Sequence, residues 1–180
     1  FVPTSWRRYH CSKTITVDMW LSDFVKRTKY LFGIKEQLES NVDITKIPVW
    51  LGGFLFPEAY LTATRQYVSQ KYQIPLESLI LEIYLQSNVA AECSFTIEGL
   101  QLECAALANN QIVLSEELSM PMPEVHLSWV QETDWSKKLK VPIYLNSARD
   151  SLLCVAAIDR DPTIESSLYH CRGVAISAWN

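Results

Sequence analysis

The sequence predicts an α+β protein, with a helical N-terminal part followed by a small antiparallel β-barrel. In the first half, apolar residues recur at three- and four-residue steps, which is the spacing of a buried helical stripe. Beyond Pro75 they recur at every second residue, which is the alternation of half-buried strands. We place a boundary between two subdomains at this change, with a helical subdomain at 1–78 and a β-barrel subdomain at 79–180.

The first helix is expected to begin at Val17, with Thr16 as its N-cap and Asp18 in its first turn. Gly33 is expected to end this helix or to let it bend toward Glu39. The apolar stripe comprises Val17, Trp20, Leu21, Phe24, Val25, Leu31 and Phe32. Three basic residues lie away from the stripe, as a solvated face or as a contact for an acidic partner: Lys26, Arg27 and Lys29.

The run from Val49 to Gln70 combines a glycine pair, a proline and a second amphipathic helix. Gly52 and Gly53 indicate a tight backbone approach before this helix. Pro57 suits its first turn, where a missing N–H is harmless. The apolar side comprises Phe56, Tyr60, Leu61, Thr64, Tyr67 and Val68. Arg65 and Gln66 then lie toward the opposite edge, where we expect them to be free to contact another module.

Strand patterns fill the rest of the sequence. Leu79, Leu81, Ile83 and Leu85 share one face of the first strand. In the next, Cys93, Phe95 and Ile97 alternate with polar residues, but after Gly99 the apolar set becomes Leu100, Leu102 and Cys104. This change of parity predicts a bulge or a sharp bend at Gly99.

The remaining strands are separated by turn signals. Asn109-Asn110 predicts a tight hairpin turn, because Asn tolerates positive φ. Further strand patterns cover residues 125–131, 141–147, 151–158 and 173–179. The run from Leu152 to Ile158 is apolar on both faces. Eight short apolar runs of this kind predict a barrel or a rolled sandwich closed around its own core.

The composition is that of an ordered globular protein. The 180 residues are 48% hydrophobic and 20% charged, and no apolar run approaches the length of a membrane span. Residues 1–78 carry 10 Lys/Arg against 7 Asp/Glu, whereas residues 79–180 carry 6 against 13. The acidic second half argues against nucleic acid as a partner and is compatible with docking on protein. We expect the sequence, which begins at Phe1, to be part of a longer polypeptide.

The sequence predicts no catalytic, cofactor-binding or metal-binding residues. None of the five glycines begins a GxxxxGK[ST] phosphate loop. The five cysteines lack paired close spacing, which favours reduced thiols in the cytosol over a disulfide framework. Asp159, Asp161 and Glu165 lack the order of a calcium loop, and a solvated turn is the better interpretation.

Two His-Cys neighbour pairs, His10-Cys11 and His170-Cys171, raise the possibility of a thiol hydrolase. Adjacent residues on an extended backbone point to opposite faces, so neither pair is expected to form the hydrogen bond that activates a thiol. His126 is expected to be a surface or packing residue.

Several motifs together resemble one family. They are PTSW (Pro3 to Trp6), TVDMWLSDF (Thr16 to Phe24), the Gly52-Gly53 to TATRQ segment, CSFTIEGLQLECA (Cys93 to Ala105), LSWVQET (Leu127 to Thr133), VPIYLNSARDSLL (Val141 to Leu153) and RGVAI (Arg172 to Ile176). The sequence thereby resembles the C-terminal domain of dynein heavy chains, and the cytoplasmic type more than the axonemal.

The resemblance implies a helical part and a β-barrel that lie across the ring of AAA+ modules of the same heavy chain. It implies a mechanical and regulatory role that tunes force and processivity, in the cytoplasm and at the cytoskeleton. The parent motor would be a dimeric ATPase acting on microtubules. From the missing phosphate loop and the composition we expect the domain itself to have no enzymatic activity, cofactor, nucleic acid or membrane partner.

Two further interpretations stay open, an autonomous β-barrel module that binds an adaptor or small ligand, and the thiol hydrolase. A cap on the ring should expose a sizeable apolar surface when it is separated, whereas an autonomous module should be polar apart from one pocket. The candidate ring interface comprises Gly52, Gly53, Arg65 and Gln66.

Overall fold

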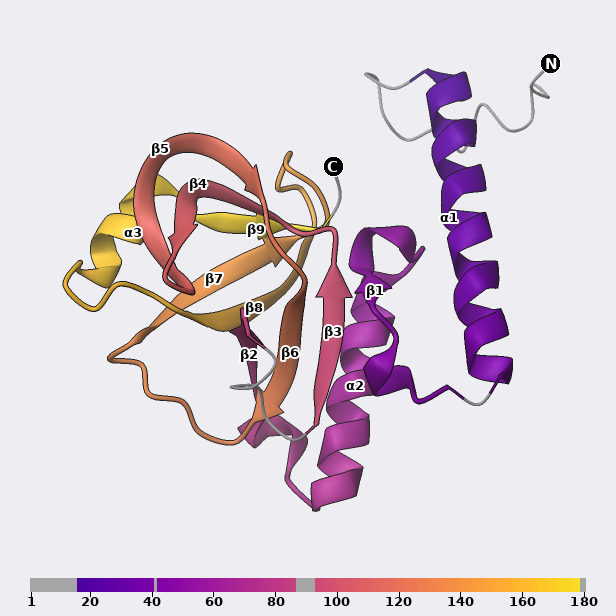
Figure 1. Ribbon diagram of the computed structural model, residues 1–180, viewed down its shortest axis with the longest axis horizontal. Helices are drawn as coiled ribbons and strands as arrows, with labels where there is room; N and C mark the ends of the chain where they lie inside the picture. The colour runs from indigo at the N-terminus through magenta and orange to yellow at the C-terminus, as the bar shows by residue number, and fades with distance from the viewer. Residues whose placement is uncertain (1–15, 41, 87–92, 179–180) are drawn as a thin grey trace. The chain divides into compact units, whose positions relative to one another are not determined.

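The computed structural model describes residues 16–40, 42–86 and 93–178, which form three α-helices, three 3₁₀ helices and nine strands (Figure 1). The helices are α1 (Val17–Glu39), α2 (Pro57–Tyr72) and α3 (Ser166–Arg172), with the 3₁₀ helices η2 (Ile44–Lys46), η3 (Leu51–Gly53) and η4 (Leu76–Ser78). The strands are β1 (Val49–Trp50), β2 (Ile80–Tyr84), β3 (Ser94–Glu98), β4 (Gln101–Ala108), β5 (Gln111–Pro121), β6 (Val125–Val130), β7 (Lys138–Tyr144), β8 (Leu152–Asp159) and β9 (Ala175–Ser177). The α+β class is confirmed.

The polypeptide divides into two compact units, Phe1–Asn41 and Val42–Asn180. The first unit contains α1, and the second contains α2, α3 and all nine described strands. The units therefore do not follow the sequence-based division into 1–78 and 79–180, which stays a prediction about subdomains. No helix in the described part of the protein is both long and apolar enough to cross a membrane.

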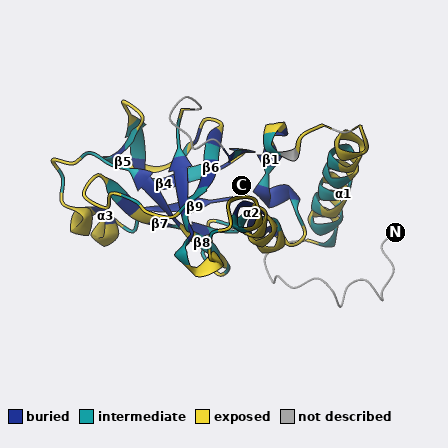
Figure 2. Cartoon of the chain, turned by 90° about the horizontal axis from the view of Figure 1, so that it is seen from below, coloured by how far each residue is buried: buried dark blue, intermediate teal, exposed yellow. Residues whose placement is uncertain are grey.

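Helix α1 begins as the sequence predicts. The side chain of Thr16 accepts a hydrogen bond from the backbone N–H of Met19 at 3.3 Å, which satisfies one donor of the first turn. The helix continues through Gly33 to Glu39, so Gly33 does not end it. No residue of α1 is buried, and the helix is drawn only in the colours of intermediate and exposed residues in Figure 2.

The strands form one mixed sheet in the order β1-β3-β6-β2-β8-β7-β9-β4-β5. Three neighbouring pairs are parallel, namely β1 with β3, β2 with β8 and β7 with β9. The prediction of an antiparallel sheet is therefore wrong, because alternation identifies strands but carries no information about their direction. Among the described strands no pairing joins β1 to β5, the two ends of the order, so closure into a barrel stays a prediction.

The core lies on one face of the central strands. Leu81 and Ile83 of β2 lie opposite Trp129 and Leu127 of β6, and all except the partly buried Trp129 are buried. Leu61 of α2 belongs to the same core, while Val68 packs in a smaller cluster with residues that include Leu79 and Phe95. We call this side of the sheet the inner face and the opposite side the outer face.

Gly99 lies at a sharp bend between β3 and β4 with φ +73°, which confirms the predicted bend. The bend separates two strands with different neighbours, since β3 pairs with β1 and β6 whereas β4 pairs with β5 and β9. The β-bulge itself lies at Cys104, where φ is +59° and four residues of β5, 115–118, stand opposite one.

The Asn109-Asn110 turn is confirmed. Both residues have positive φ, at 50° and 60°, and Ala108 pairs directly with Gln111 across them. These angles are those of a two-residue type I′ hairpin, whose twist matches that of the strands.

Helix α3 is a departure from the prediction, which had only strands beyond Pro75. The helix has seven residues and a single buried one, Tyr169, so it is too short to show a helical period. The hydroxyl of Tyr169 donates to the backbone carbonyl of Ile112 at 3.0 Å, which fixes α3 to β5.

Candidate functional site

The glycine pair and the second helix are packed into their own compact unit. Gly52 and Gly53 are buried in η3, directly after β1. Pro57 occupies the first turn of α2, as predicted, and Leu61, Thr64 and Val68 are the other buried residues of this helix. Burial of the glycine pair is consistent with a close backbone approach, and it leaves little of either residue exposed.

Aromatic rings connect α2 to β3. Phe54 and Tyr60 stack with their ring centres 5.2 Å apart, and Tyr60 meets the edge of Phe95 at 6.5 Å. Tyr67, two turns farther along α2, contacts the same Phe95 ring at 6.2 Å. Edge-to-face and offset-stacked pairs of this kind stabilise packing beyond the area that they bury. Most of the predicted apolar side of α2 therefore packs on the sheet, but Phe56 is 69% exposed and does not belong to the packed side.

Arg65 is used inside the unit and is not free, contrary to our expectation. One of its terminal nitrogens donates to the backbone carbonyl of Leu76 at 2.6 Å and lies 3.3 Å from that of Leu79. Its guanidinium also lies 5.3 Å from the centre of the Trp129 ring. The indole N–H of Trp129 in turn donates to Thr64 at 3.0 Å. The long arginine side chain reaches around α2, so its position on the helical wheel did not reveal these contacts.

Gln66, the neighbour of Arg65, is exposed. The four candidate interface residues therefore differ in their surroundings: Gly52 and Gly53 are buried, Arg65 is partly buried and Gln66 faces solvent. Their role in contacting another module stays a prediction, and Gln66 is the residue best placed for it.

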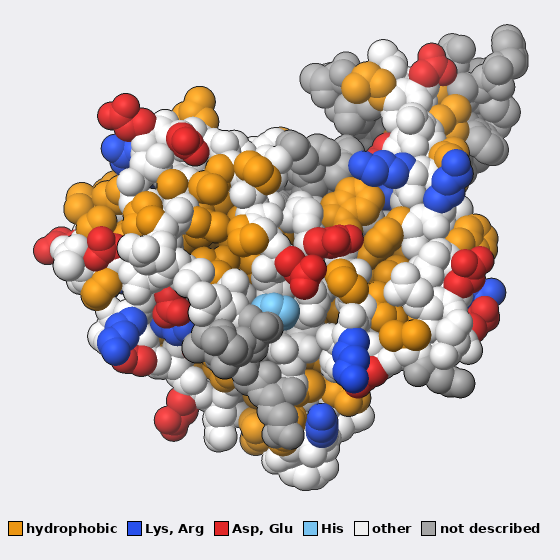
Figure 3. Space-filling model, viewed as in Figure 1, with side chains coloured by type: hydrophobic (Ala, Val, Ile, Leu, Met, Phe, Trp, Pro, Cys, Tyr) orange, Lys and Arg blue, Asp and Glu red, His pale blue; other side chains and the backbone are white. Residues whose placement is uncertain are grey.

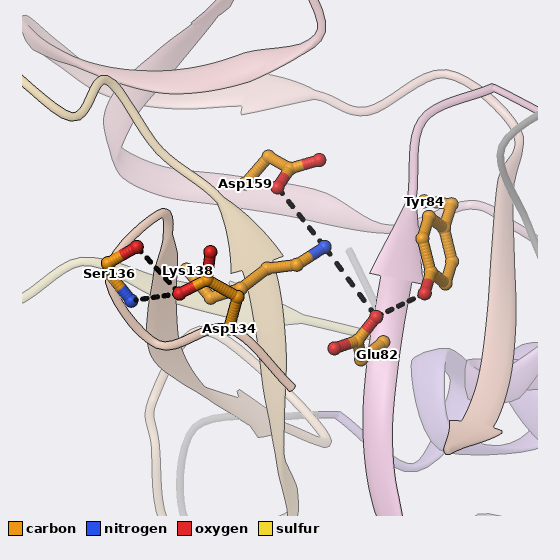
Figure 4. Close-up of polar contacts among 6 residues, drawn as sticks. All are labelled: Glu82, Tyr84, Asp134, Ser136, Lys138 and Asp159. Carbon is orange, nitrogen blue, oxygen red and sulfur yellow. Dashed lines mark hydrogen bonds and ion pairs between the residues drawn. The ribbon is translucent and has the colours of Figure 1, made fainter. Parts of the chain in front are cut away.

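A polar cluster that the sequence analysis did not find lies on the outer face of the sheet (Figure 4). Lys138 of β7 lies between two carboxylates, at 3.6 Å from Glu82 of β2 and 3.1 Å from Asp159 of β8. The hydroxyl of Tyr84 donates to Glu82, and the Lys138 ammonium lies 4.7 Å from the centre of the Tyr84 ring. Nearby, Asp134 accepts hydrogen bonds from the N–H and hydroxyl of Ser136.

The centre of the cluster is shielded from water, whereas the side chain of Asp159 is 39% exposed. Glu82 is only 3% exposed, and the side chain of Lys138 is 11% exposed. Burial raises the pKa of Tyr84 well above its ordinary value, and the hydrogen bond to Glu82 and the negative charges of Glu82 and Asp159 raise it further. Tyr84 is therefore neutral and Glu82 is paired, an arrangement that stabilises the structure.

A second ion pair links the β4 bulge to the loop after β7. Arg149 donates from two nitrogens to one oxygen of Glu103, at 3.0 and 2.8 Å. Glu103 is 7% exposed and directly precedes the bulge residue Cys104. Desolvation lowers the pKa of Arg149, but the hydrogen bonds and charge of Glu103 together with smaller contributions from Cys104 outweigh it and raise the pKa. The sequence does not predict the ion pair of Glu103 and Arg149, because the two residues lie on separate segments.

Comparison with known proteins agrees with the motifs. Residues 1–176 match the family model for the C-terminal domain of the dynein heavy chain. This protein belongs to that family. It is 38% identical to the cytoplasmic dynein heavy chain of Dictyostelium discoideum and 36% identical to that of Drosophila melanogaster, over 99% and 97% of its own length. The axonemal dynein heavy chain 9 of Homo sapiens is 26% identical over 82% of the present sequence.

This dynein C-terminal domain spans about 4% of the length of the curated relatives that it matches. Membership in the family makes it part of a motor protein of the cytoskeleton. The similarity to cytoplasmic dynein heavy chains points to a cytoplasmic location.

The described residues of the dynein domain contain no group of three or more His, Cys, Asp and Glu side chains that could hold a metal. In the acidic run, Asp159 pairs with Lys138, and Asp161 accepts two hydrogen bonds from Thr163. Those bonds lower the pKa of Asp161, as expected for a carboxylate that closes its own turn.

The histidines and cysteines in the described ranges of the domain show no catalytic arrangement. His170 and Cys171 lie on α3 rather than on an extended backbone, so the geometric premise of our sequence argument is wrong for this pair. His170 bonds the carbonyl of Ser166, and His126 lies 3.4 Å from Thr96. Cys93, Cys104, Cys154 and Cys171 are not joined in disulfides, and burial raises the pKa of Cys154 to about 12. His10 and Cys11 lie outside the described residues.

A shallow hollow lies near the tip of the β4–β5 hairpin, in a region where Figure 3 shows hydrophobic side chains gathered. It has a volume of about 280 Å³ and is lined by Leu85, Leu107, Ala108, Asn109, Asn110, Met120 and Pro123. Small-molecule sites usually enclose ~300–1,000 Å³ and contain several convergent polar groups. This hollow is open and has no charged side chain in its lining, so it gives little support to a small-ligand module.

Proposed function

We propose that this protein is a non-catalytic domain that caps the AAA+ ring of its own heavy chain and tunes the force and processivity of movement along microtubules. The parent motor hydrolyses ATP and acts as a dimer, while the domain supplies contacts between ring modules.

The observation that carries this proposal is the apolar surface of α1. The helix spans 23 residues without one buried side chain. Its predicted stripe includes Phe24, Val25 and Phe32, which are 42%, 48% and 60% exposed. A helix with no buried residue and with three apolar residues this exposed gains little stability from tertiary packing, so we infer that its natural surroundings include more protein. An autonomous module would not be expected to show this surface.

The polar interior supports a mechanical rather than chemical role. Both carboxylates that are more than nine-tenths buried, Glu82 and Glu103, are paired with a cation from another strand or loop among the described residues. Paired charges that cross-link strands make a unit stiff, which suits a part that transmits force.

The test removes residues 1–180 from the full heavy chain and compares the shortened motor with the complete one. We expect movement and ATP hydrolysis to persist, with changed stall force and run length in single-molecule assays. Equal stall force and run length in the two motors would contradict the proposed function.

The alternative of an adaptor-binding module is tested with the same pair of motors. If removal of the domain abolished recruitment of an adaptor while leaving the mechanics of the motor unchanged, the domain would be an independent interaction module.

A further inference from the structure

Half of the outer face of the central strands carries apolar side chains that are partly or largely exposed. Register places Val130 of β6 opposite Ile80 of β2, and Val155 of β8 opposite Pro142 of β7, all on the outer face. Leu152 of β8 lies opposite Tyr144 of β7 on the same side. We call these six residues the outer apolar row; Val155 is 49% exposed and Leu152 is 56% exposed.

On the other half of the same face, the polar side chains pair with one another. There, Glu82 and Tyr84 of β2 lie beside Lys138 and Asp159, and these four side chains satisfy one another (Figure 4). On β2 the polar Glu82 is followed two residues along the same face by the apolar Ile80. On β8 the polar Asp159 is followed on this face by Ala157 and then by Val155.

The composition of β8 indicates that both of its sides are meant to be covered. Residues 152–158 are apolar without interruption, a pattern typical of strands buried on both faces. The inner side is buried at Ala156 and Ile158. The outer side is buried at Ala157 but open at Val155 and Leu152, so part of the strand lacks the cover that its sequence implies.

The outer apolar row is bordered by aromatic and cationic side chains, as protein interfaces commonly are. The ammonium of Lys140, which precedes Pro142 on the outer face of β7, lies 4.6 Å from the centre of the Trp135 ring. At the other end the Arg149 guanidinium lies 6.0 Å from the centre of the Tyr144 ring. An apolar centre with aromatic and cationic groups at its edge is the usual anatomy of a protein contact.

We propose that the outer apolar row is the face on which this domain docks against the preceding part of its own heavy chain. The inference rests on the proposed function and specifies which face of the domain makes the contact. The complementary surface is apolar, with a carboxylate within reach of Lys140.

Size favours a tethered partner over a second copy. A stable interface between separate proteins takes about 20–30 residues from each side, and the row offers six. A segment of the same polypeptide has a high effective concentration, so a small contact suffices for it. The domain spans about 4% of the length of its relatives, which leaves most of a heavy chain to supply the partner.

The test measures thiol labelling in the complete heavy chain. Val155→Cys is compared with Leu168→Cys on α3, a matched control because both positions are 49% exposed. Each labelling rate, resolved by peptide mass spectrometry, is divided by the rate in the urea-denatured protein. We expect Val155→Cys to be protected about tenfold or more relative to Leu168→Cys, because a covered thiol reacts only after local opening. Equal protection at the two positions would overturn the inference.

A photo-crosslinker at Leu152 identifies the occupant. A cross-link to residues of the same heavy chain that precede this domain supports the proposal. Cross-links to a second heavy chain, to residues 17–39 or to another protein would each overturn it, as would the absence of any cross-link.

The two proposals fail separately. If removal of the domain changes stall force and run length but Val155→Cys is labelled as fast as the control, the docking face is wrong and the function stands. If removal changes nothing while Val155→Cys is protected, the docking face stands and the regulatory role is wrong.

Discussion

Arg65 shows how a single arginine fixes a helix to a sheet. It bonds the carbonyls of Leu76 and Leu79, which lead into β2, and lies against Trp129 of β6. We expect Arg65→Ala to lower the free energy of unfolding by about 1–3 kcal/mol, through the lost hydrogen bonds and ring contact. Urea unfolding measures this, with the exposed Gln66→Ala as a control that should change stability by less than about 0.5 kcal/mol. An Arg65→Ala variant as stable as the control would show that these contacts contribute nothing.

Two glycines provide opposite outcomes for the same kind of substitution. A Cβ on Gly99 would lie 2.7 Å from a ring carbon of Trp50, and φ there is +73°. We expect Gly99→Val to lower the free energy of unfolding by about 1–3 kcal/mol.

A Cβ on Gly33 meets nothing within 4 Å in the middle of α1. We therefore expect Gly33→Ala to increase the free energy of unfolding by about 0.5–1 kcal/mol and to raise the helicity. Thermal unfolding and circular dichroism check the two signs, and a tolerated Gly99→Val would mean that the bend relaxes.

At the scale of single residues, the sequence correctly predicts those features that depend on the local backbone alone. Thr16 as a cap, Pro57 in a first turn and the Asn109-Asn110 hairpin are all confirmed. Arg65 was misjudged because its acceptors are carbonyls 11 and 14 residues away, and only the folded protein brings them near.

Among the elements, β2, β7 and β8 are held together by buried charges. We expect Lys138→Met to lower the free energy of unfolding at pH 7 by about 2–4 kcal/mol, because it leaves Glu82 buried without its cation. Adding Glu82→Gln should restore part of this loss, since it removes the unpaired charge. Urea unfolding of both single variants and of the double variant gives a double-mutant cycle, which measures the coupling energy between Lys138 and Glu82. Strictly additive losses would show that the two residues do not interact.

The same three strands should respond to alkaline pH through Tyr84. Its pKa is raised above the ordinary value of 10.0, so the unfolded protein releases this proton at lower pH than the folded one. The stability that it contributes is therefore complete below about pH 10 and is lost as pH rises toward the folded pKa. Tyr84→Phe should be less stable at pH 8 by about 1 kcal/mol, from the lost hydrogen bond, but should decline less steeply above pH 10. Parallel slopes for the two proteins, measured by urea unfolding, would argue against this effect.

Strand positions were largely predictable, but strand partners were not. β6, β7, β8 and β9 overlap the four late strand patterns, because alternation against a core is a local signal. The pairing of β2 with β8 joins segments about 75 residues apart in parallel, which no local pattern encodes. The cluster around Glu82 depends on this pairing and was missed for the same reason.

For the whole domain, the clearest expectation concerns nucleotide. None of the glycines begins a phosphate loop, and Gly52-Gly53 lacks a lysine after it. We expect the domain, produced by itself, to show no saturable binding of ATP in a calorimeter at micromolar concentrations. Saturable binding there would reopen the question of an enzymatic role.

The position of β9 has a consequence for synthesis of the protein. β9 lies between β7 and β4, and in the order of the sheet it alone joins the β4–β5 hairpin to the other strands. The hairpin ends at Pro121 and β9 ends at Ser177, so 56 residues must be translated between them (177 − 121). At about 5–20 residues per second this takes roughly 3–11 s. During that interval Leu102, which is fully buried in the finished fold and lies opposite Ile176 of β9, belongs to a hairpin without this neighbour, and a chaperone at the ribosome would find it accessible.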